Sequence, residues 1–94
     1  MTSYTIRQTR EFRDWLDALR DKRAQVRIAA RLRLAEVGSL GDWRPVGEEV
    51  SEMRIDIGLR YRLYFTRQAR KLIVVLAGGD KSTQARTLSG HNAW

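Results

Sequence analysis

Two stretches in the second half of the chain alternate polar with apolar residues, and this alternation limits the fold more than any other feature. Residues 51–57 read Ser-Glu-Met-Arg-Ile-Asp-Ile, and residues 60–65 read Arg-Tyr-Arg-Leu-Tyr-Phe. A period of two residues is typical of β-strands with one buried face and one open face. Residues 71–77, which are apolar after Lys71, indicate a third and central strand. The second half of the chain therefore predicts a sheet.

The first half predicts one short strand and a helix. Residues 3–7 alternate Tyr and Ile with polar residues, which favours a strand. Thr9 then offers an N-cap for a helix. The apolar residues that follow recur at the spacing of one helical stripe: Phe12, Trp15, Leu16 and Leu19.

A second helix is predicted over residues 22–37, with Asp21 as its N-cap and Gly38 as its stop. We expect its inward face to be formed by Val26, Ala29, Ala30, Leu34 and Val37, with Arg23, Arg27, Arg31 and Arg33 in solvent. Residues 39–49 contain Gly41, Asp42, Pro45 and Gly47 and indicate a loop.

The predicted element order is β-α-α-β-β-β, an α+β fold in which a helical hairpin packs on one face of a mostly antiparallel four-stranded sheet. We expect the 94 residues to form a single domain, 1–94. A domain of this size has little room for an enclosed pocket, so we expect an open groove on the uncovered face of the sheet.

The charge favours a polyanionic or acidic partner. The chain has 18 basic and 11 acidic residues, a formal net charge of +7, and 15 of the basic residues are arginine. Arginine pairs with phosphate through two parallel hydrogen bonds, which suits a nucleic acid, although a genome rich in arginine codons explains the bias equally well.

Other features of the composition restrict cofactors and location. The chain has no cysteine and one histidine, so thiolate and multi-histidine metal sites are excluded, and we expect neither metal nor cofactor. The first residues lack the apolar stretch of a signal peptide, and no segment is long and apolar enough for a membrane span. We therefore expect a cytoplasmic protein without a membrane partner.

The open face of the sheet is the predicted site. If the apolar residues of the two alternating strands lie under the helices, Arg54, Arg62 and Tyr64 share the opposite face. Residues 78–84, Gly-Gly-Asp-Lys-Ser-Thr-Gln, follow the central strand as a loop. Its two glycines can form an anion-binding nest, or simply a turn.

The element order, the strand Tyr-Arg-Leu-Tyr-Phe at 61–65 and the segment 78–84 resemble RelE/HigB-type toxins of bacterial type II toxin–antitoxin modules. The resemblance covers residues 4–86 and is greatest to the phage-related, addiction module killer branch. It implies a RelE/ParE-like fold and a ribosome-dependent endoribonuclease that cuts translated mRNA. It also implies a cognate antitoxin, often of the helix-turn-helix type in this branch.

The resemblance assigns roles to individual residues. Arg62 matches the strand arginine that contacts the scissile phosphate, Arg54 stands where the family has a catalytic lysine, and Lys81 matches the basic residue of the last loop. The chain departs from the family at Asp56, where a second lysine is expected, and near Thr87, where a tyrosine is expected. Residues 87–94 do not show the family's basic C-terminal helix, so the resemblance implies that they are a divergent or truncated tail of the RelE-like domain.

The chemistry implied needs no metal. Arg62 and Arg54 would stabilise negative charge, because an arginine stays protonated and cannot act as a base. Lys81 would donate a proton or add charge. Asp56 would be the general base, unless it forms a salt bridge with Arg54 or Arg62. Additional RNA-binding candidates are Arg60, Tyr64 and Arg86; Tyr64 would stack on a base or be an ordinary strand aromatic.

Two other functions fit the same fold. A ParE-like toxin would bind DNA gyrase without cutting RNA, although the convergence of Arg54, Arg62 and Lys81 argues against it. An inactive toxin would only bind its antitoxin, as Asp56 and the short tail suggest. Whichever function holds, the antitoxin would either lay an acidic, amphipathic segment over the basic groove or pack a helix on the arginine-rich helical hairpin.

Overall fold

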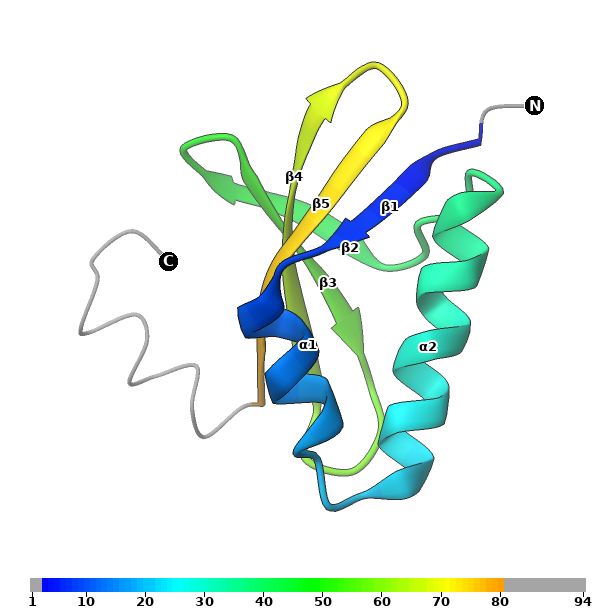
Figure 1. Cartoon of the computed structure of the whole chain (residues 1–94), viewed down its shortest axis with the longest axis vertical. Helices are drawn as coiled ribbons and strands as arrows, with labels where there is room; N and C mark the ends of the chain where they lie inside the picture. Colours follow the sequence, from blue (N-terminus) through cyan, green and yellow to red (C-terminus); the bar gives the residue numbers. More distant parts are fainter. Residues whose placement is uncertain (1–2, 81–94) are drawn as a thin grey trace.

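The computed structural model describes residues 3–80, which form two helices and five strands (Figure 1). The predicted site residues Lys81 and Arg86 lie outside this range, as does the tail at 87–94. The elements are β1 (Thr5–Gln8), α1 (Arg10–Asp17), α2 (Lys22–Glu36), β2 (Trp43–Gly47), β3 (Val50–Ile55), β4 (Tyr61–Ala69) and β5 (Leu72–Gly79).

The strands form one mixed sheet in the order β1-β5-β4-β3-β2. β1 is parallel to β5, and the other three pairs of neighbours are antiparallel. The α+β class is confirmed, but the prediction of four strands was wrong, because the segment expected to be a loop contains β2. β2 is at the end of the strand order, where Pro45 is tolerated because a strand at the edge of a sheet has backbone groups that need no partner.

Both predicted N-caps are confirmed. The Thr9 hydroxyl accepts a hydrogen bond from the Phe12 amide at 3.0 Å and donates one to the Leu76 carbonyl at 2.7 Å, so it fixes the start of α1 to β5. The Asp21 carboxylate accepts hydrogen bonds from the amides of Arg23 and Ala24 in the first turn of α2. Both helices lie over one face of the sheet (Figure 1), and each packs on the sheet more than on the other helix.

The predicted inward face of α2 was wrong. The buried residues of this helix are Ala24, Ile28, Leu32 and Ala35, whereas Val26 and Leu34 are 70% and 48% exposed. The helix has two apolar stripes on opposite sides, because residues two apart are separated by about 200° around the axis. Hydropathy alone did not indicate which stripe faces the sheet.

The alternation of the sheet strands is confirmed. Met53 and Ile55 of β3 and Tyr61, Leu63 and Phe65 of β4 are buried in the core with the inward residues of the helices. Gly78 and Gly79, which were expected to form a turn or an anion-binding nest, belong to β5 and pair with Leu63 and Arg62. Gly78 lies under the indole ring of Trp15, where no side chain fits.

Candidate functional site

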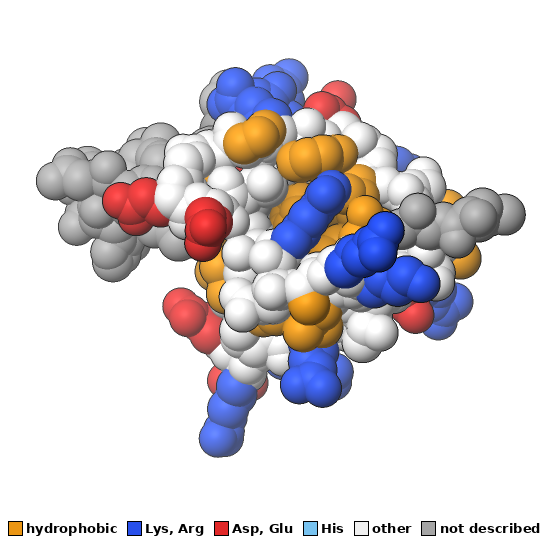
Figure 2. Space-filling view, turned by 90° about the horizontal axis from the view of Figure 1, so that it is seen from above, with side chains coloured by type: hydrophobic (Ala, Val, Ile, Leu, Met, Phe, Trp, Pro, Cys, Tyr) orange, Lys and Arg blue, Asp and Glu red, His pale blue; other side chains and the backbone are white. Residues whose placement is uncertain are grey.

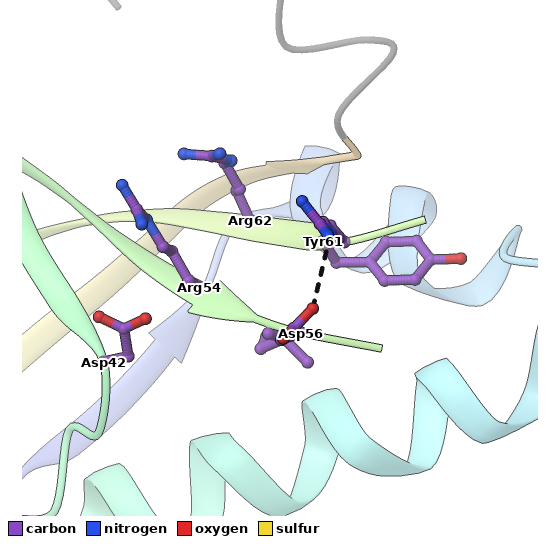
Figure 3. A pocket seen from close by; sticks show the side chains of 7 residues that line it. Asp42, Arg54, Asp56, Tyr61 and Arg62 are labelled. Atoms are coloured by element: carbon purple, nitrogen blue, oxygen red, sulfur yellow. Dashed lines mark ion pairs between the residues drawn. The ribbon is translucent and has the colours of Figure 1, made fainter. Parts of the chain in front are cut away.

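Two arginines lie side by side on the sheet face opposite the helices. Arg54 of β3 and Arg62 of β4 are direct cross-strand neighbours. Their side chains point to the same side of the sheet (Figure 3). The alternation therefore places this pair as predicted, because core residues occupy the other positions of both strands.

A buried glutamate connects the two arginines. Glu52 is 1% exposed, and its Oε1 atom accepts hydrogen bonds from Arg62 Nη1 at 2.8 Å, Arg44 Nε at 3.1 Å and Arg54 Nε at 3.3 Å. The three arginines come from three neighbouring strands, β2, β3 and β4. Each guanidinium has five N–H donors, so bonding to Glu52 leaves donors for a second anion.

Tyr64 occupies the same face but is not an exposed platform. It lies opposite Glu52 of β3 and Ala77 of β5, and it is 5% exposed. Stacking of a base on this ring therefore requires it to be uncovered first.

A depression of about 270 Å³ lies beside the arginine pair, lined by Asp42, Arg54, Ile55, Asp56, Arg60, Tyr61 and Arg62. Asp56 and Arg60 belong to the turn between β3 and β4 and form an exposed ion pair, with 3.7 Å between Oδ1 and Nε (Figure 3). Asp56 thus pairs with Arg60 rather than with the expected Arg54 or Arg62. Its side chain is 90% exposed, which leaves it open to a ligand.

On the helix side of the sheet, Arg31 of α2 holds the backbone of the strand that carries Arg54. Arg31 of α2 donates to the Arg54 carbonyl at 2.6 Å through Nη1 and to the Leu40 carbonyl at 3.0 Å through Nη2. Burial lowers the pKa of Arg31, and the Asp42 carboxylate partly opposes this shift. Arg31 was expected in solvent, but it joins α2 to the strand that carries Arg54.

Tyr61 is not suited to reach a ligand held by the arginines. Its ring points away from Arg54 and Arg62 in Figure 3 and packs edge-on against Trp15. Burial raises the pKa of the Tyr61 phenol, with additional contributions from the Asp21 and Asp80 carboxylates. The phenol therefore remains protonated at neutral pH.

The positive charge of the site is partly compensated. Arg44, Arg54, Arg60 and Arg62 face three carboxylates, those of Asp42, Glu52 and Asp56. Additional basic side chains lie elsewhere, among apolar ones at the end of the molecule seen in Figure 2. The site is therefore a geometrically ordered cluster of guanidinium groups rather than the main source of the net charge.

A match to a protein-family model shows the family to which this chain belongs. The model of the family described as "Phage derived protein Gp49-like (DUF891)" matches residues 14–89, which include every residue of the site described above. The chain belongs to this Gp49-like family. The family is associated with toxins of toxin–antitoxin addiction modules.

The Gp49-like chain is also similar to a protein of Haemophilus influenzae (strain ATCC 51907 / DSM 11121 / KW20 / Rd). The two are 40% identical over 83 residues, which cover 88% of this chain and 84% of the relative. The relative is described only as an uncharacterized protein, so it supports the family and assigns no activity.

The structure of this Gp49-like chain brings together Arg54, Arg62, Asp56 and Arg60, which were predicted from the sequence. It adds Glu52, which was not predicted as a site residue. The available signal was its position two residues before Arg54, which puts both side chains on one face of β3. Arg44 and Asp42 were missed because their segment was expected to be a loop.

Two features are absent from residues 3–80 of the Gp49-like chain. Neither helix of this range is long and apolar enough to cross a membrane. The same range contains no group of three or more His, Cys, Asp or Glu side chains placed to hold a metal ion.

Proposed function

We propose that this chain is the toxin of a type II toxin–antitoxin module and acts as a metal-independent, ribosome-dependent endoribonuclease on translated mRNA. The observation that carries the proposal is the ordered pair Arg54 and Arg62 on an open sheet face, beside a depression that contains an exposed carboxylate. Family membership supports the toxin–antitoxin context, and the resemblance to RelE/HigB-type toxins supplies the reaction.

In the proposed reaction the ribose 2′-oxygen attacks the adjacent phosphorus, and the bond from phosphorus to the 5′-oxygen breaks. Asp56 accepts the proton of the 2′-hydroxyl, since its carboxylate lines the depression and is 90% exposed. Arg62 and Arg54 stabilise the charge that builds up on the phosphoryl oxygens. The 5′-oxygen takes a proton from Lys81, which lies outside the described residues.

Glu52 acts as a positioning residue in this proposal. Its Oε1 atom holds Arg62 Nη1 at 2.8 Å, and Arg62 is the least exposed of the three arginines at 19%. A guanidinium fixed before the substrate arrives loses less conformational entropy when it binds a phosphate. Arg60, Tyr64 and Arg86 remain predicted RNA contacts.

One observation favours a second candidate, an antitoxin-binding module without nuclease activity. The carboxylate of Glu52 already pairs with three arginines, and Asp56 already pairs with Arg60. If these pairs do not open for a phosphate, the fold retains its partner surface but not its chemistry.

The test is induced expression in bacteria, with primer-extension mapping of a translated mRNA for wild type, Arg62→Ala and Arg70→Ala. Arg70 is an exposed arginine of the β4–β5 turn and serves as the matched control. We expect codon-phased cuts in wild type and Arg70→Ala, and a loss of about 100-fold or more in Arg62→Ala. Growth arrest with intact mRNA would contradict the nuclease and favour a gyrase-type target, whereas absence of toxicity would favour the inactive module.

A further inference from the structure

The side of α2 that faces away from the sheet carries a second apolar stripe. We call it the outer stripe, and it consists of Val26, Ala29, Ala30, Leu34 and Val37. Val26, Leu34 and Val37 are 70%, 48% and 59% exposed, and together with Leu59 they are the exposed large hydrophobic residues of the described range 3–80. Exposed apolar residues that recur at helical spacing indicate a contact surface rather than scattered surface residues.

The surface along the outer stripe is hollowed rather than smooth. Two shallow depressions, of about 480 and 530 Å³, share Val26 and Ala30 in their linings. The small side chains of Ala29 and Ala30 let a partner backbone approach between Val26 and Leu34. From Val26 to Val37 the stripe runs about 16 Å along the axis, which corresponds to three turns of a partner helix.

The charge around the outer stripe specifies an acidic partner. α2 contains Lys22, Arg23, Arg27, Arg31 and Arg33 but one acidic residue, Glu36, at its last position. Arg31 points toward the sheet, and the other four cations line the two depressions. An amphipathic helix with acidic residues beside its apolar face would complement both properties.

The same charges argue against other occupants. A second copy of the chain would bring Arg23, Arg27 and Arg33 against equivalent arginines, which is unfavourable. A lipid surface would favour large aromatic anchors, but the stripe consists of Val, Ala and Leu. RNA binds basic surfaces through its phosphates, so the apolar centre of the stripe would contribute nothing to RNA binding.

We propose that the outer stripe of α2 is the docking surface for an acidic amphipathic helix of the antitoxin. The proposal rests on the proposed toxin function and specifies its partner surface. It selects the helix rather than the arginine site as the place of binding, because Arg54 and Arg62 lie on the opposite face of the sheet from both helices.

The probe is the protein encoded by the gene adjacent to that of this chain, titrated calorimetrically against the full-length chain. Val26→Glu/Leu34→Glu should weaken binding about 100-fold or more, because it introduces two like-charged carboxylates into the contact with an acidic helix. Leu59→Glu, which alters an exposed leucine of the β3–β4 turn outside the outer stripe, should stay within about threefold of wild type. The variant Arg54→Ala/Arg62→Ala should also bind as wild type does.

Several results would overturn the inference: wild-type binding by the stripe variant, loss of binding only in the arginine-site variant, or no binding by wild type. Self-association or binding to anionic vesicles that the stripe variant abolishes would also overturn it, because the occupant would then be a second copy or a lipid. Cleavage of mRNA by the free chain is measured in a separate experiment. A failure of the nuclease hypothesis can therefore be distinguished from a failure of the docking hypothesis.

Circular dichroism and thermal melting check that the variants fold. If the double variant Val26→Glu/Leu34→Glu does not fold, two single variants, Arg27→Glu and Arg70→Glu, are compared in its place. Each replaces one exposed arginine and changes the net charge by two units. We then expect about tenfold weaker binding for Arg27→Glu only, with a dependence on salt. Equal effects of the two reversals would overturn the inference.

Discussion

Glu52 is the residue that turns three separate arginines into one ordered cluster. One carboxylate oxygen accepts from Arg44, Arg54 and Arg62, but the three pairs differ in exposure. The Arg44 and Arg54 side chains are 58% and 41% exposed, so water and salt screen their interaction with Glu52. The pair with Arg62 therefore contributes most to stability.

Replacing Glu52 with glutamine should lower the free energy of unfolding by about 2 kcal/mol, because it removes the buried counter-charge of Arg62 while keeping the side-chain shape. The measurement is guanidinium chloride denaturation followed by circular dichroism. Glu48→Gln, in the exposed β2–β3 turn, is the control and should change the free energy by less than about 0.5 kcal/mol. Equal stability of Glu52→Gln and wild type would show that the network does not stabilise the fold.

At the level of elements, the local pattern predicted four of the five strands and both helix caps, but it missed β2 and did not predict which faces pack together. The alternation in β3 and β4 has one apolar face, so its orientation was unambiguous, and the position of Arg54 and Arg62 followed from it. α2 has two apolar stripes, and only the fit of Ile28 and Leu32 into the core selects between them. β2 was missed because Pro45 and Gly47 are typical of loops, although an edge strand accepts them.

The packing of α1 on β5 requires a glycine at position 78, because Trp15, a residue far away in the sequence, lies against it. Gly78 and Gly79 together are typical of a turn, so the local pattern favoured a loop. The actual constraint is the Trp15 ring, which occupies the place of a side chain at Gly78. A contact between residues so distant in sequence leaves no local signal.

Gly78→Ala should therefore lower the free energy of unfolding by about 1–3 kcal/mol, because the added Cβ would overlap the six-membered ring of Trp15. In a Trp15→Leu background the additional cost of Gly78→Ala should fall below about 0.5 kcal/mol, which a double-mutant cycle measures by denaturation. Equal costs in both backgrounds would attribute the effect to something other than the ring.

For the molecule as a whole, the net charge of +7 and the ordered arginine cluster are separate properties. The cluster faces three carboxylates, and other cations lie at the end of the molecule seen in Figure 2. This end includes the β4–β5 turn with Arg70 and Lys71 (Figure 1). Arg67 near the same turn lies over the rings of Trp43 and Tyr4, with 5.0 and 5.6 Å from its Cζ to the ring centroids. Diffuse charge attracts RNA, whereas the cluster would hold one phosphate group.

The salt dependence of RNA binding separates these two contributions. Binding of a short single-stranded RNA should weaken linearly on a log–log plot against salt, with each neutralised phosphate adding about 0.7 to the slope. Because the two arginines would together hold one phosphate, Arg54→Ala/Arg62→Ala should reduce the slope by about 0.7. Arg70→Ala/Lys71→Ala removes the same net charge and should reduce it by less than about 0.2. Fluorescence anisotropy over a series of potassium chloride concentrations measures both. Equal reductions would mean that RNA responds only to total charge, and the arginine cluster would then have no privileged role in binding.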